Sequence, residues 1–415
     1  MTLACCLATS NFCEARHHRD QQQADLSARV VQPTGAAAKG ASDTSLKSRV
    51  QSILQEYQKE EEERSQRTFS NKSANLKQLA MTTKDEGGTL LFSDSPEYVP
   101  TEGILYRDTV EGKARVLYYH LNNTSEAKKV AVVVENMYDG LNRVRVTRGG
   151  SGSPSDDYLK VGKQAQVQYF GTEMNHIITL SRNDARLLVE QMNNIIMRPG
   201  QLVYGCYDFT ADHPVKVSVM MLDAYGDPVD ESRRLPVLPK DEMRLRGTFT
   251  QMNRVLTPAQ PYDPAKDGAV YFPLADNITD HYREGIDATD NSHVTDFGNY
   301  GILYTIKIPA TATRTPVQYY LSPLGGVYAG AMRVYHGDMT DELETPANQR
   351  YFGDATPPES SLVETAREHG TWSMNDATEI SNLGVYDSDE DTIFEFSPPG
   401  ASNLPVNIIL QPKKE

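Results

Sequence analysis

The chain has 415 residues, of which 39% are hydrophobic, and its formal net charge at pH 7 is -15. Binding to nucleic-acid backbones depends largely on clustered lysine and arginine, so this acidic balance argues against DNA or RNA as a partner. No apolar run reaches the roughly 18 residues that a membrane-spanning helix needs, so we expect no transmembrane segment.

The first 43 residues predict export followed by a tether. Residues 1–15 have the small and apolar run of a partial signal peptide, with Ala15 as a cleavage position but without the usual basic start. A lipoprotein signal with Cys5 or Cys6 as the modified residue is the alternative. Residues 16–43 are rich in Gln, Ala, Gly and Ser, which predicts a disordered tether. We therefore expect an extracellular or cell-envelope-associated protein.

Residues 44–80 predict a helical spacer. Within it, an apolar stripe with spacings of three or four residues marks one narrow helix face, and the stripe consists of Val50, Ile53, Leu54 and Tyr57. This pattern fits a solvated spacer helix, and it also fits a helix that docks or self-associates.

From Thr89 onward the pattern changes to period two with β-branched and aromatic residues, which predicts strands. We assign residues 88–235 to a first β-sandwich domain. The glycine- and serine-rich residues 149–158 predict a long hairpin loop rather than a phosphate loop, because they lack a Lys-Ser/Thr ending and a following helix. Residues 182–196 predict the one internal helix of a mainly β fold made of one or two antiparallel β-sandwich units.

Residues 236–415 predict a second, β-rich domain. Residues 276–295 are rich in Asp, Asn, His and Thr and predict a long polar loop. Two buried strands with glycine turns follow, GNYGILYTIKI at 298–308 and GGVYAGAMRV at 325–334. We expect turn or core roles, rather than chemistry, for Gly298, Asn299, Tyr300, Gly301, Gly325, Gly326, Tyr328 and Gly330.

These two motifs resemble a module of secreted bacterial surface proteins described as copper amine oxidase-like or stalk domain-containing. The resemblance covers roughly residues 90–340, and it implies a bacterial envelope protein whose own activity is undefined. It does not imply amine oxidase chemistry, because Tyr300 is followed by Gly301 rather than by an acid and the sequence contains no His-x-His motif. We therefore reject that activity.

Two groups of residues are candidates for binding. Tyr118-Tyr119 and Tyr319-Tyr320 are doublets in predicted strands, where neighbours point to opposite faces. We expect one tyrosine of each doublet to be buried and the other to be available to a sugar or a protein, with ordinary strand composition as the alternative. A calcium loop is the second candidate, with a solvated loop as its alternative, because carboxylates alternate at Asp387, Asp389 and Asp391. No other cofactor is predicted.

Cys206 has no nearby His or basic residue in the sequence, so we expect a small buried residue rather than a nucleophile. The function that these patterns favour is a non-catalytic exported cell-envelope protein that binds a partner protein or glycan, self-associates, or forms part of the surface. An extracellular hydrolase of glycans or peptides, with catalytic carboxylates in loops, is the alternative. The first needs an exposed apolar patch or a sheet edge, and the second needs a cleft with converging titratable groups.

Overall fold

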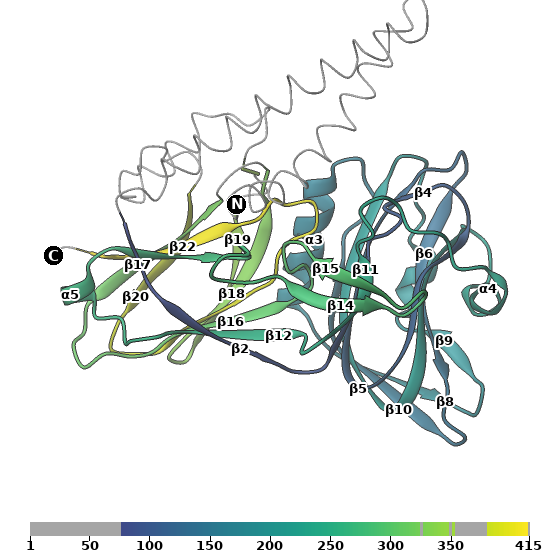
Figure 1. The fold of residues 1–415 in the computed structure, drawn as a ribbon, viewed down its shortest axis with the longest axis horizontal. Coiled ribbons are helices and arrows are strands. Elements are labelled where there is room, and N and C mark those ends of the chain that lie inside the picture. Colours follow the sequence, from purple (N-terminus) through teal and green to yellow (C-terminus); the bar gives the residue numbers. More distant parts are fainter. Residues whose placement is uncertain (1–75, 324–326, 348–350, 353–379, 414–415) are drawn as a thin grey trace, which may run out of the picture.

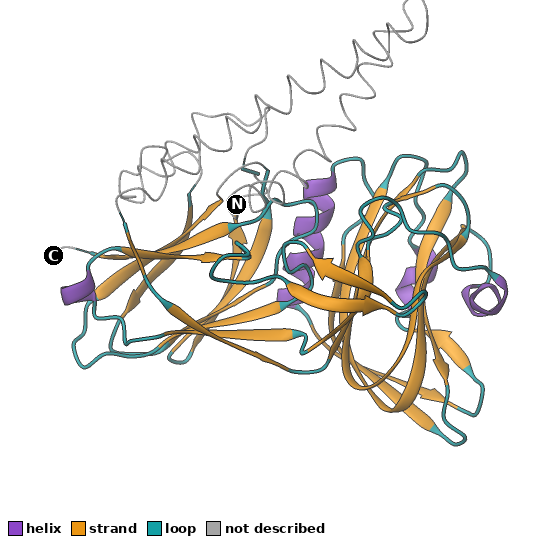
Figure 2. Ribbon diagram, in the orientation of Figure 1, coloured by secondary structure: helices purple, strands orange, loops and turns teal. Residues whose placement is uncertain are grey.

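The computed structural model describes residues 76–323, 327–347, 351–352 and 380–413. Strands dominate these residues, which confirms the predicted mainly β fold class (Figure 2). The signal peptide at 1–15, the tether at 16–43 and the spacer up to residue 75 lie outside the described residues. None of the described helices has the length and apolar character that crossing a bilayer requires.

The largest sheet has eleven strands, and two long antiparallel strands, β5 (Gly103–Asn122) and β10 (Leu202–Asp223), form its centre. On its other side β10 pairs with β6 (Lys128–Asn136) along its C-terminal half and with β7 (Asn142–Ser151) along its N-terminal half. The remaining strands of this large sheet are β3 (Thr89–Ser93), β4 (Tyr98–Val99), β8 (Glu173–Leu180), β9 (Ala185–Leu187), β11 (Arg246–Thr250), β14 (Arg283–Asp287) and β15 (Ser292–Asp296).

Two smaller sheets form a sandwich beside the large sheet (Figure 1). Across this sandwich the rings of Tyr319 and Phe394 lie 5.2 Å apart. The five-stranded sheet contains β1 (Lys77–Gln78), β13 (Val270–Leu274), β22 (Val406–Pro412), β17 (Pro316–Pro323) and β20 (Ser381–Asp387). The six-stranded sheet contains β19 (Met339–Thr345), β18 (Gly330–His336), β21 (Thr392–Phe396), β16 (Leu303–Ile308), β12 (Asn253–Pro258) and β2 (Met81–Glu86).

Helix α3 (Tyr158–Gly171) stands between the sandwich and the large sheet (Figure 1). Its Val161, Ala165 and Phe170 belong to the same buried cluster as residues of all three sheets. A second cluster, which includes Val116 and Val132, covers the opposite face of the large sheet. The large sheet is therefore buried on both faces over much of its area.

The chain does not divide at residue 235 as the sequence predicts. Strands β11, β14 and β15 come from the predicted second domain but belong to the large sheet. Strand β2, from before the predicted first domain, pairs with β12, and β1 pairs with β13. The predicted boundary is wrong because backbone pairing joins segments that are far apart in the sequence, and local composition carries no signal of that pairing.

The helix predicted at 182–196 is wrong. Ala185–Leu187 is strand β9, which pairs with β6, and Glu190–Asn194 is a 3-10 helix, η1. The backbone N–H of Leu188 also donates to the carbonyl of Val132, at 2.8 Å. Pairing with β6 buries the apolar residues of this segment, so the tertiary context outweighs the local helix propensity.

The glycine-rich residues 149–158 are not a long hairpin loop, because β7 runs into them and α3 follows. Asp157 caps α3 by accepting a hydrogen bond of 3.1 Å from a backbone N–H of its first turn. A Cβ on Gly150 would lie 2.2 Å from the carbonyl oxygen of Ala165 in α3. The glycine therefore allows the strand and helix backbones to approach closely. Two shorter helices, α4 (Pro228–Arg234) and α5 (Pro264–Asp267), complete the described helices.

Candidate functional site

The motif at 298–301 is the turn where the large sheet meets the sandwich. Gly298, Asn299 and Gly301 have φ values of +108°, +54° and +80°, which side chains other than glycine and asparagine rarely adopt. The Asn299 side chain donates to the Tyr304 hydroxyl at 2.7 Å, and the carbonyl of Gly301 accepts from Arg115 of β5 at 2.9 Å. These conformations and contacts are those of a buried turn.

The other motif residues are also buried. The Tyr300 hydroxyl donates to the carbonyl of Ser402 at 2.6 Å, so it is a core contact. Tyr328 has no exposed surface and its backbone pairs with Phe352. A Cβ on Gly330 would lie 2.8 Å from the Pro399 ring, which explains the glycine. The remaining two motif glycines, Gly325 and Gly326, lie outside the described residues.

The tyrosine doublets do not form an exposed binding face, and that prediction is wrong. Tyr118, Tyr119, Tyr319 and Tyr320 are 1%, 9%, 2% and 3% exposed. Neighbours do point to opposite faces, as expected, but a different buried cluster covers each face of both strands. Strands with a buried cluster on each face bury both members of a doublet, and the sequence does not show which strands these are.

The three predicted calcium ligands do not converge. Asp387 forms an ion pair with Arg314 at 2.6 Å, and Asp391 accepts from the backbone N–H of Ala310 at 2.7 Å. Asp389 lies on the exposed turn between them. Within the described ranges, no group of three or more His, Cys, Asp or Glu side chains is placed to hold a metal ion. Calcium binding stays a prediction.

Cys206 is fully enclosed by neighbouring side chains, as predicted. It is 5% exposed and belongs to the core cluster between the large sheet and the sandwich. Burial raises the pKa of its thiol to about 12, so the thiolate that a nucleophile needs is not formed near neutral pH.

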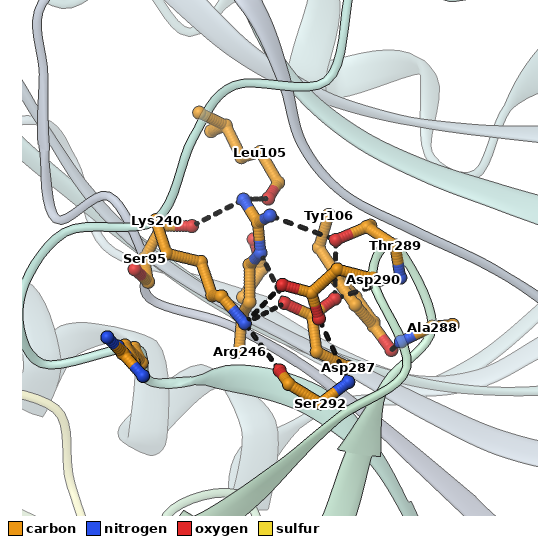
Figure 3. A network of polar contacts seen from close by, with 12 residues as sticks. Ser95, Leu105, Tyr106, Lys240, Arg246, Asp287, Ala288, Thr289, Asp290 and Ser292 are labelled. Atoms are coloured by element: carbon orange, nitrogen blue, oxygen red, sulfur yellow. Dashed lines mark hydrogen bonds and ion pairs between the residues drawn. The ribbon is translucent and has the colours of Figure 1, made fainter.

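A buried arginine–carboxylate network joins strands of the large sheet. Figure 3 shows Arg246 of β11 and Lys240 converging on Asp287, which has no exposed surface. Arg246 Nε donates to Asp287 Oδ2 at 2.9 Å, and its Nη1 donates to the carbonyls of Leu105 and Leu238 at 2.9 and 2.8 Å. Burial alone would raise the pKa of Asp287, but hydrogen bonds from Thr289 and Arg246 lower it by more. The pKa therefore lies below its ordinary value and the carboxyl stays ionised.

This network also corrects the reading of residues 276–295 as a long polar loop. The segment contains the hairpin of β14 and β15, and β14 pairs with β11. Its buried carboxylates, Asp280 and Asp287, therefore face arginine side chains rather than solvent. The network fixes the hairpin to the rest of the large sheet.

A surface hollow of about 430 Å³ lies beside β2, β12 and β14. Its central carboxylate, Asp85, accepts from Arg254 at 2.7 Å and also pairs with Arg283. The nearby buried Asp280 pairs with the same Arg254 and accepts from the Tyr304 hydroxyl at 2.8 Å. These carboxylates are committed to arginines, so their arrangement is that of a structural ion-pair network.

Asp296, at the start of the motif turn, is the buried carboxyl in this region that lacks a basic partner in contact. Its Oδ1 accepts from the backbone N–H of Tyr300 at 2.9 Å, while Oδ2 has no hydrogen-bond partner in the described part of the chain. Burial raises its pKa well above the ordinary value, and that hydrogen bond and the charges of Arg254 and Arg283 offset only part of the shift. The folded state therefore favours the protonated form.

We expect Asp296→Asn to remove a pH dependence of stability. Because the folded-state pKa lies above the unfolded value of about 3.9, this group stabilises the fold fully below pH 4 and loses that contribution as pH rises through the folded pKa. Between those two pKa values, urea unfolding should show that the free energy of unfolding of the wild type falls by about 1.4 kcal/mol per pH unit relative to that of the variant. A difference between the two proteins that does not vary with pH would contradict this assignment.

The apolar loop between β6 and β7, residues 137–141, is the exposed candidate site, and we call it the 137–141 loop. Its Met137, Tyr138 and Leu141 side chains are 52%, 43% and 57% exposed. Exposed apolar side chains that lie together on a protein surface often mark an interaction site, whereas single exposed apolar residues are common and need no explanation. The loop also includes the Asp139-Gly140 turn.

Two buried asparagines hold this loop in one conformation. Asn136 is 1% exposed, and its amide donates to the carbonyl of Gly140 at 2.8 Å while its oxygen accepts from the N–H of Tyr138 at 3.0 Å. Asn142 has no exposed surface and donates to the carbonyl of His213 at 2.9 Å. A loop fixed in this way loses little conformational entropy when it binds.

The Tyr138 ring stacks on the His213 imidazole, with the ring centres 3.9 Å apart and the planes 19° from parallel. One face of the tyrosine is thus covered and its edge remains available. Sequence reasoning missed this site. The only signal was three apolar residues around an Asp-Gly turn, and their exposure depends on the neighbouring strands.

Comparisons with known proteins give no family. No family model matches the chain, and no curated protein matches it. The solved structures found include vicilin from Solanum lycopersicum (tomato), at 10% identity and a TM-score of 0.11 over 77% of this chain and 84% of that chain. The Momordica charantia 7S globulin has 7% identity and a TM-score of 0.12 over 80% and 84%. Vicilin from Capsicum annuum has 11% identity and a TM-score of 0.10 over 77% and 85%. Scores this low carry no argument about fold or function.

Proposed function

We propose that this chain is a non-catalytic exported protein of the cell envelope that binds a partner protein through the 137–141 loop. The observation that carries this proposal is the exposure of Met137, Tyr138 and Leu141 on a loop fixed by two buried asparagines. Fixed apolar anchors are typical of the centre of a protein interface. Export itself is supported only by the leader-like residues 1–15.

A protein partner fits this loop better than a glycan. Sugars stack on open aromatic faces, and His213 covers one face of Tyr138. The flanking Met137 and Leu141 offer aliphatic surface that complements apolar side chains. The hydrolase alternative requires carboxylates free to exchange protons, whereas Asp280 and Asp287 are held by arginines.

The test is a triple substitution, Met137→Ser, Tyr138→Ser and Leu141→Ser. Proteins that the wild-type chain captures from envelope extracts are identified and purified. Each is then titrated against the wild-type chain and against the triple variant. We expect the triple variant to bind its partner at least about tenfold more weakly, because three desolvated anchors are lost. The asparagine scaffold remains, so the fold should be unchanged.

Tyr225→Ser is the matched control, because Tyr225 is 89% exposed and lies outside the loop. It should bind like wild type. Equal affinity of the triple variant and the control would contradict the proposed site. Cell fractionation tests export separately, and an uncleaved chain confined to the cytosol would contradict the envelope assignment.

A further inference from the structure

Strand β8 (Glu173–Leu180) is an unprotected edge of the large sheet. Among the described strands it pairs with β7 alone, so one side of its backbone is open. Natural sheets usually protect such edges with charges, proline or bulges. Its first residue, Glu173, is charged, but residues 174–180 contain no Asp, Glu, Lys, Arg or Pro.

Other edge strands of the molecule are protected in the usual way. β2 carries Lys84, Asp85 and Glu86, and β19 carries Asp341, Glu342 and Glu344. Strand β20 has an irregular register with its partner, and its Gly384 has a φ of +111°. β8 is eight residues long; its register with β7 shifts between Val146 and Arg148, and it is regular from Leu180 to His176, so residues 176–180 are the regular part of this edge. An edge of this kind is suited to receive another strand.

The outer face beside this edge is basic, in contrast to the acidic chain as a whole. Arg143 and Arg145 of β7 lie opposite Thr179 and Ile177 of β8, so all four side chains share one face, and all four are exposed. Neither arginine has a hydrogen bond or ion pair in the described part of the chain. Nearby Arg182 and Arg186 are instead paired with Asp139 and Asp184.

We propose, building on the binding function proposed above, that β8 accepts an extended acidic segment of the partner as an added strand. Main-chain hydrogen bonds to the open edge supply affinity, and side chains on alternate positions supply specificity. The added strand lies two strand spacings, roughly 9.6 Å, from β7. Glutamates on its outer face meet Arg143 and Arg145 across this distance, because both side chain types are long.

The opposite face of the added strand is apolar. Ile178 and Leu180 of β8 are buried on the inner face, at 6% and 0% exposure, so the next strand continues that layer. The partner segment therefore alternates glutamate with an apolar residue such as valine. The acidic charge also directs the segment to this patch, because most of the remaining surface of a chain with a net charge of -15 repels it.

The test uses the full chain and fluorescent synthetic peptides, measured by anisotropy. A peptide of four Val-Glu repeats should bind, and a peptide of four Val-Lys repeats should bind at least about tenfold more weakly. Arg143→Glu with Arg145→Glu should reverse that preference, and both positions are exposed, so the fold should be kept. A Val-Glu peptide with N-methyl groups on every amide should lose binding, because it has no backbone N–H left to donate to the open edge.

Three results would overturn the proposal: no binding of the Val-Glu peptide, unchanged preference in the double variant, or equal binding of the N-methylated peptide. The last would show charge attraction without strand addition. The serine triple variant of the 137–141 loop separates the two proposals. This variant should still bind the Val-Glu peptide. If the wild-type chain captures a partner through the loop but does not bind the peptide, the edge site is rejected and the loop site is kept.

Discussion

Replacing Arg115 by methionine is expected to lower the free energy of unfolding by about 3–5 kcal/mol. Arg115 is 1% exposed and donates to both carboxylate oxygens of Asp208, at 2.6 and 2.8 Å. It also donates to the carbonyls of Met252 and Gly301, each at 2.9 Å. The substitution leaves two carbonyls without this donor and leaves Asp208, whose side chain is 15% exposed, with the hydrogen bond from the Tyr169 hydroxyl at 3.0 Å but without its charge partner. Loss of the charge partner of a mostly buried carboxylate is what makes such losses large.

Urea unfolding at neutral pH measures this loss. Arg314→Met is the matched control, because it breaks an arginine–aspartate pair whose arginine is exposed, and its stability should equal wild type within error. Asp208→Leu added to Arg115→Met should recover part of the loss, since no charge is then buried alone. A loss below about 1 kcal/mol for Arg115→Met would show that the contacts of Arg115 do not stabilise the fold.

Gly150→Ala is expected to destabilise the protein by about 1–3 kcal/mol, towards the upper end of that range. The added Cβ would lie 2.2 Å from the Ala165 carbonyl oxygen and 2.6 Å from the Tyr169 backbone nitrogen. Both are main-chain atoms of α3, so no side chain rotation relieves the clash. The helix must move away from β7, and this movement would disturb the packing of the core that it shares with the sandwich.

Thermal or urea unfolding measures this effect, with Gly226→Ala as the control. A Cβ on Gly226 would meet its neighbours at 3.5 Å or more, which is ordinary contact, so that variant should stay within about 0.5 kcal/mol of wild type. If both alanine variants were equally stable, close approach of β7 and α3 would not be the reason for glycine at position 150.

The predictions that succeeded from sequence rest on local rules. Alternating β-branched residues predict strands because successive side chains of a strand face opposite sides. The glycines of the 298–301 motif predict a turn because positive φ values exclude most other residues, and two of them have such values. Cys206 was predicted to be buried because nothing around it in the sequence would activate a thiol, and it is 5% exposed.

The predictions that failed required knowledge of distant neighbours. The apolar pattern at 182–196 is compatible with a helix or with a strand, and pairing of β9 with β6 decided it. The doublets at 118–119 and 319–320 are compatible with one exposed face, but a buried cluster lies on each side of their strands and covers both tyrosines. The domain boundary failed for the same reason, since β2 and β12 pair across about 170 residues of chain.

The sequence by itself determined that this is an acidic, mainly β protein whose glycine and asparagine turns are structural, because residue conformation and side-chain alternation are local properties. Only the tertiary structure decided where its surface is open. The 137–141 loop is exposed and β8 is an edge because of which strands the rest of the chain places beside them, and each depends on pairing between residues that are not neighbours in sequence.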